Sequence, residues 1–152
     1  MKRFRFKLET VLRHRAFKED CLQAELGELR REEAREQACL DDLRRQLHEA
    51  REAIVDALVR NAPVGELERR DEYAKAKRDD VRVQELTLDA VRERVAAKLA
   101  EVVEAMKGRK VLETLRDKQE RAYVVECARA EQNQLDDMAS VGFARRVTAH
   151  SQ

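Results

Sequence analysis

The residues that could bind a metal or act as a nucleophile are present in this chain, but their spacing forms no recognisable site. The cysteines are Cys21, Cys39 and Cys127, and the histidines are His14, His48 and His150. Three cysteines are an odd number and include no C-x-x-C pair, which argues against a disulfide framework and against zinc. We therefore expect reduced cytosolic thiols, surface histidines and no bound metal.

Paired carboxylates, common agents of acid–base catalysis, occur at residues 32–33, 41–42 and 136–137. Ala, Leu, Glu, Lys and Arg make up 89 of the 152 residues, a composition typical of long helices and coiled coils. A pair of helices has no cleft that would shift the pKa of a carboxylate or exclude water. We predict that these carboxylates are solvated, that the chain needs no cofactor, and that it is not an enzyme.

The charge of the chain is balanced although its charged residues are many. Basic residues number 32 and acidic residues 31, which gives a net charge of +1. Nucleic-acid binders gain affinity from net positive charge, so this balance argues against nucleic acid as a partner. No apolar run reaches the roughly 18 residues of a membrane span, and the N-terminal residues lack the apolar core of a secretory signal. We expect a cytosolic protein that does not insert into the membrane.

One clear break divides the chain into two helical segments. Pro63 is the only proline and lies in the segment Asn61–Gly65. Proline lacks the amide donor that a helix interior needs, and Asn and Gly favour turns. The pattern predicts an all-α fold and a single domain over residues 1–152. We expect a helix at about 5–60, a turn at 61–65, a helix at about 66–140 and a flexible tail at about 147–152.

Both segments carry a seven-residue repeat of apolar residues. In the first, eleven of fifteen seam positions between Leu8 and Ala57 are apolar. In the second, the repeat runs from Leu67 to Val102 and changes phase beyond Gly108, as a stutter does. Because the connection is short, these repeats predict a long antiparallel two-helix coiled-coil hairpin.

Folding the chain at Pro63 pairs residues whose numbers sum to about 126. This register predicts three layers, in which Leu40 meets Leu86 and Leu88, Leu26 meets Leu99 and Val102, and Leu12 meets Leu112 and Leu115. The second segment is longer than the first, so its last ~20 residues have no partner within the chain.

Four charged residues interrupt the first seam, namely Arg15, Glu19, Glu33 and Glu36. In one interpretation they lie at the open flank of the seam, with their charged groups in water. In the other they form ion pairs that fix the register at some cost in stability. These pairs would join Glu19 to Lys107 or Lys110, and Glu33 to Arg92 or Arg94.

Aromatic and basic residues alternate at the N-terminus and recur near the C-terminus. Phe4, Arg5 and Phe6 lie near the start, and residues 143–146 read FARR. An antiparallel hairpin places both groups at the same end, and clustered Phe and Arg are typical of binding hot spots. In the alternative, Phe4 and Phe6 only fasten the first turn of the helix while the cations are solvated.

Two stretches of the chain are similar to the FliJ family. Residues 4–15 read FRFKLETVLRHR and resemble its opening signature, F-x-F-x-L-E-x-V-L followed by a basic residue. Residues 112–119, LETLRDKQ, and residues 131–138, EQNQLDDM, resemble its closing stretch. Asp137 stands where the family more often has Glu. The similarity spans nearly the whole chain, including its length and its single central break.

Resemblance to the FliJ family implies a stalk and adaptor of the bacterial flagellar type III export apparatus, with a fold similar to the γ-subunit coiled coil of F-type ATPases. Such proteins enter the hexameric export ATPase FliI, which works with FliH, and promote its activity. They connect the ATPase to the export-gate protein FlhA and recycle export chaperones. The resemblance implies a role in flagellum assembly and motility, at the cytoplasmic side of the cell membrane at the flagellar base.

The resemblance also implies two partner-binding sites. In the family, the contact with FlhA begins at an aromatic residue early in the second helix, which here is Tyr73. The positions that follow, Lys77, Asp80 and Gln84, are more polar than the family pattern. The contact with the ATPase ring would use both ends of the chain, at Phe4, Arg5, Phe6, Leu135, Met138, Phe143, Arg145 and Arg146.

Two other functions fit the same features. The YscO group, the equivalent stalk of virulence type III secretion systems, has the same expected shape and class of partner, and genomic neighbours would distinguish it. A generic scaffold coiled coil would form a stable parallel oligomer. This chain is expected to be a monomeric hairpin or a weak dimer.

Overall fold

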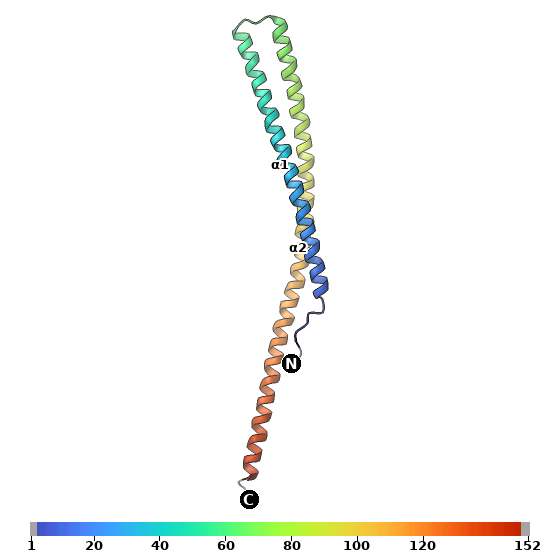
Figure 1. The fold of residues 1–152 in the computed structure, drawn as a ribbon, viewed down its shortest axis with the longest axis vertical. Coiled ribbons are helices and arrows are strands. Elements are labelled where there is room, and N and C mark those ends of the chain that lie inside the picture. Colours follow the sequence, from blue (N-terminus) through green and yellow to red (C-terminus); the bar gives the residue numbers. More distant parts are fainter. Residues whose placement is uncertain (1–2, 150–152) are drawn as a thin grey trace. The chain divides into compact units, whose positions relative to one another are not determined.

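Two long α-helices make up most of the protein. The structure, a computed structural model, describes residues 3–149, and describes side chains as far as residue 142. Helix α1 spans Glu9–Val59 and helix α2 spans Val64–Ala149, with 51 and 86 residues. Figure 1 shows one short connection between them. The described residues contain no strand, and the predicted all-α hairpin of two packed helices is confirmed.

The packing divides the chain into two units, each of which contains part of both helices. We call Lys18–Glu104 the turn unit, because it includes the connection between α1 and α2. The terminal unit comprises Met1–Phe17 and Ala105–Gln152.

The ends of both helices differ from the predicted positions. Helix α1 begins at Glu9 rather than near residue 5, and residues 3–8 form a non-helical segment before it. Helix α2 continues to Ala149 rather than ending near residue 140, since residues 141–149 contain no proline to stop it. Of the predicted flexible tail, residues 147–149 are helical, and residues 150–152 lie outside the described residues.

The turn has the residues that its backbone requires. Asn61 has a φ of 53°, a left-handed conformation that asparagine tolerates better than most residues. The amide of Ala62 donates to the carbonyl oxygen of Ala57 at 2.9 Å, which closes the end of α1. The carbonyl of Pro63 accepts from the amide of Glu66 at 2.9 Å and so caps the start of α2. The break predicted at Pro63 is confirmed.

Ion pairs across the turn unit show the antiparallel register. Each of three pairs joins α1 to α2 with a separation of 2.8 or 2.9 Å. They are Arg44 with Glu85, Arg94 with Glu32 and Lys98 with Glu25. The two residue numbers sum to 129, 126 and 123 in these pairs, so the predicted sum of about 126 is confirmed.

The core of the turn unit follows the predicted seam, with one correction. Leu40 and Leu88 are buried, as are Leu26 and Val102. Leu86 and Leu99, which were predicted to join these layers, are 65% and 42% exposed. Leu86 lies two residues before Leu88, and two residues correspond to about 200° around a helix, so both cannot face the same seam.

The charged seam residues do not all behave alike. Glu33 pairs with Arg92 at 3.4 Å, as the ion-pair interpretation predicts. Glu36 accepts a hydrogen bond from Gln84 of α2 at 2.5 Å. The Glu19 side chain is only 4% exposed, so the prediction that its charged group lies in water is wrong. Its predicted pairing with Lys107 or Lys110 stays a prediction.

In the terminal unit, the N-terminal segment contributes to the core. Phe6 is buried in a cluster with Leu12 and Leu112, and Phe4 and Leu115 pack against it. This cluster contains the predicted layer of Leu12, Leu112 and Leu115. Residues 3–8 therefore lie across α2 instead of extending α1.

The glycines of the helices allow a test of local stability. A Cβ at Gly27 would have no atom within 4 Å beyond its own turn of the helix, and glycine inside a helix costs about 1 kcal/mol relative to alanine. We expect Gly27→Ala to raise the free energy of unfolding by about 0.5–1 kcal/mol, measured by urea denaturation.

Gly108 provides the comparison. The Nη1 atom of Arg15 donates to the Gly108 carbonyl at 3.0 Å, and a Cβ at this position would lie 2.6 Å from that nitrogen. Gly108→Ala must displace the Arg15 side chain, so we expect a smaller gain than at Gly27. A larger gain would contradict this account of the contact.

Candidate partner-binding surfaces

Three surfaces carry the residues that the sequence singled out. One surrounds Tyr73 in the turn unit, and the other two lie in the terminal unit, at the N-terminal segment and along the end of α2. The residues described by the structure include no group of three or more His, Cys, Asp or Glu arranged to hold a metal ion. No helix among them has an apolar stretch long enough to cross a bilayer.

Tyr73 lies at the edge of the space between α1 and α2. Its side chain is 53% exposed, whereas the next residue, Ala74, is only 3% exposed and occupies the seam. The Lys77 ammonium lies 5.5 Å from the centroid of the Tyr73 ring, within the range of a cation–π contact. About half of the Tyr73 side chain is therefore available to a partner, and the alternative, a role inside the seam near Ile54, stays a prediction.

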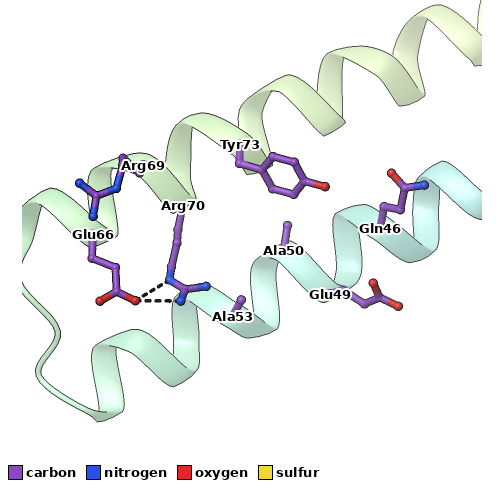
Figure 2. Close-up of a pocket in the computed structure, with 8 residues that line it drawn as sticks. All are labelled: Gln46, Glu49, Ala50, Ala53, Glu66, Arg69, Arg70 and Tyr73. Atoms are coloured by element: carbon purple, nitrogen blue, oxygen red, sulfur yellow. Dashed lines mark hydrogen bonds and ion pairs between the residues drawn. The ribbon is translucent and has the colours of Figure 1, made fainter.

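A groove of about 600 Å³ runs beside Tyr73, between α1 and α2. Figure 2 shows its lining, which consists of Gln46, Glu49, Ala50, Ala53, Glu66, Arg69, Arg70 and Tyr73. Arg70 donates to Glu66 from Nε at 2.9 Å and from Nη2 at 2.8 Å. Hydrogen bonds from Arg70 and Arg60 lower the pKa of Glu66, so this carboxylate stays ionised.

Sequence reasoning missed the contribution of α1 to this groove. The seven-residue repeat of the first segment includes Ala50 as an ordinary apolar position and does not include Ala53. The sequence does contain a feature that indicates the groove. Small alanines replace leucine near the turn, and they leave unfilled space between the helices.

The N-terminal surface separates its aromatic residues from its basic ones. Residues 3–6 have no regular secondary structure, and residues 7–8 form a turn that leads into α1. Phe6 is buried and Phe4 packs on Tyr123, with the ring centroids 5.7 Å apart, while Arg5 and Lys7 are exposed. The alternative that Phe4 and Phe6 fasten the segment is favoured for both residues, and the cations are left for a partner.

The exposed cations line a hollow of about 790 Å³ in the terminal unit. Arg5, Lys7, Arg13 and Arg116 contribute positive charge, and Glu9 and Glu120 contribute negative charge. The formal excess of two positive charges makes this hollow suitable for carboxylates of a partner.

The end of α2 extends beyond the segment of the chain that packs on it. Val124, Leu135 and Met138 are 59%, 61% and 73% exposed. Residues 11 and 14 positions apart are about three and four helical turns apart, so these three side chains lie on one face of α2. On that face Glu131 separates Val124 from Leu135 and Met138, and these last two residues form the apolar stripe at the end of α2.

The two basic-aromatic ends lie apart along α2. Phe143, Arg145 and Arg146 belong to α2, and their side chains lie outside the described residues. Phe143 is 20 residues beyond Tyr123, the partner of Phe4, which corresponds to about 30 Å of helix. The prediction that both groups serve the same end of the hairpin stays a prediction.

The comparison with known protein families decides the identity of the chain. Residues 4–148 match the model of the family described as FliJ, flagellar FliJ protein. This chain belongs to the FliJ family. No curated protein and no solved structure matches the sequence. Membership of the FliJ family implies a non-catalytic stalk or adaptor role in flagellar type III protein export.

Proposed function

We propose that this member of the FliJ family is a stalk of the export apparatus that enters the hexameric ATPase FliI, promotes its activity and links it to the export gate FlhA. FliH and export chaperones complete the proposed set of partners. The protein would work at the cytoplasmic side of the membrane at the flagellar base and serve flagellum assembly and motility. It would not hydrolyse ATP itself.

The observation that carries the contact with the ATPase is the exposed apolar stripe at the end of α2. Leu135 and Met138 expose most of their side chains, and no other part of the described chain covers them. Burial of such side chains contributes roughly 1.5–3 kcal/mol each, so a ring channel that encloses them gains affinity. The narrow helix also suits entry into a channel.

The cationic hollow of the terminal unit supports the same contact. Arg5 and Lys7 are exposed, and no ion pair holds either among the described residues. Guanidinium groups bind carboxylates strongly and with defined geometry. The C-terminal Phe143, Arg145 and Arg146 would extend this contact further along α2.

The proposed gate contact is centred on Tyr73. Its exposed ring has the character of a binding anchor, which gives a large contact area at low entropic cost. Because Tyr73 is in the turn unit, FlhA and the ATPase would bind different units of the chain.

We expect FliI to co-purify with the chain in a pull-down assay. We also expect the chain to raise the ATP hydrolysis rate of FliI several-fold and to hydrolyse no ATP by itself. A chain that forms a stable parallel oligomer and does not retain FliI would contradict the proposal and favour a scaffold. Preferential binding to an injectisome ATPase would instead favour the YscO group.

A further inference from the structure

We propose that Ala50 and Ala53 of α1 form the floor of a docking groove, in which an apolar side chain of the export gate inserts beside Tyr73. This inference rests on the proposed contact with FlhA and extends it to the other helix. The gate would then recognise a surface made by both helices.

The shape of the groove supports insertion of a side chain. Ala50 is 7% exposed and Ala53 is half-buried, and Figure 2 shows their methyl groups pointing from α1 toward α2 next to Tyr73. The volume of about 600 Å³ falls in the range of about 300–1,000 Å³ typical of ligand clefts. In an ordinary coiled coil, larger seam residues would fill this space.

The charges of the groove indicate what kind of side chain fits. Its lining has two carboxylates, Glu49 and Glu66, and two guanidinium groups, Arg69 and Arg70. Their formal charges cancel, and Glu66 and Arg70 already bind each other at 2.8 Å. A charged group entering the groove would lose its water without gaining an excess of opposite charge. The alanine methyl groups and the Tyr73 ring instead match an aliphatic or aromatic side chain.

The decisive variant fills the groove from α1 without touching Tyr73. Ala53→Leu adds apolar volume to a half-buried site, so we expect an unchanged or higher denaturation midpoint. We expect the affinity of the full-length chain for the detergent-purified FlhA protein to fall at least about tenfold, about 1.4 kcal/mol. Ala24→Leu, at an exposed position of α1 in the same unit, is the matched control and should leave affinity unchanged.

Salt gives an independent measurement. Because the proposed anchor is apolar, raising salt from about 0.05 M to about 0.3 M should change the affinity of the unmodified chain by less than about twofold. A steep loss of affinity with salt would mean that the anchor is not apolar.

If Ala53→Leu lowers the denaturation midpoint, the variant Ala53→Met is used in its place, because the methionine side chain is more flexible.

The outcomes separate the groove from the proposed function. If Tyr73→Ala weakens FlhA binding but neither Ala53 variant does, the proposed insertion into the groove is wrong, while the proposed contact of FlhA with Tyr73 is supported. If FlhA binds the unmodified chain and neither Tyr73→Ala nor an Ala53 variant weakens this binding, the insertion into the groove and the contact at Tyr73 are both wrong. If Tyr73→Ala and a folded Ala53 variant weaken binding and Ala24→Leu does not, the groove is supported.

Discussion

Replacing Phe6 by alanine is expected to lower the free energy of unfolding by about 3–5 kcal/mol, because it removes a large side chain from a core that cannot collapse fully. Phe6 is 6% exposed and lies against Leu12 and Leu112. Circular dichroism during urea denaturation measures the change. Hydrogen exchange should rise most in residues 9–17 and 105–117, within the same unit.

Phe4→Ala is the matched control for Phe6→Ala. Phe4 is half-buried and contacts the edge of the same cluster, so its loss should cost about 1–2 kcal/mol, mostly through the ring contact with Tyr123. An unchanged midpoint for Phe6→Ala would mean that the segment does not pack on α2 in solution. Deletion of residues 1–7 would remove this core as well as the cations, so charge reversal of Arg5 and Lys7 is the cleaner test of binding.

Placing two negative charges on the apolar stripe should strongly reduce the effect on the ATPase. We expect Leu135→Glu combined with Met138→Glu to reduce the stimulation of FliI at least tenfold, because burying two unpaired carboxylates in a channel is strongly unfavourable. Both side chains are mostly exposed, so the denaturation midpoint should hardly change. The ATPase rate and circular dichroism are measured on the same samples.

The control places the same charges on a different face of α2. Ala130→Glu combined with Asn133→Glu has the same three-residue spacing, and both positions are exposed on α2. This variant should keep at least half of the stimulation if the stripe alone enters the channel. Equal loss in both variants would show that added negative charge, and not burial of Leu135 and Met138, explains the effect.

The sequence was sufficient to predict the hairpin because its determinants are local and periodic. A seven-residue repeat sets the seam, Pro63 sets the turn, and the two together set the register. The ion pair of Arg94 with Glu32 lies where this register requires. Such features can be read without knowledge of any tertiary contact.

Features that depend on tertiary packing could not be predicted in the same way. Leu8 continues the heptad of α1, yet the helix begins at Glu9 and Leu8 is 38% exposed. The chain leaves the helix there because Phe6 gains burial against Leu112, a residue far away in the sequence. The groove beside Tyr73 likewise results from space between two helices, which no repeat in either helix reveals.

The antiparallel seam also sets an order for the folding reaction. Contacting residues are 6 positions apart for Arg60 and Glu66, 41 for Arg44 and Glu85, and 93 for Arg15 and Gly108. Since closing a longer loop costs more entropy, contacts should form first at the turn and proceed toward the termini. The turn unit therefore belongs to the folding nucleus, and the Phe6 cluster closes late. Changes at the turn will mainly slow folding, whereas changes at Phe6 will mainly speed unfolding.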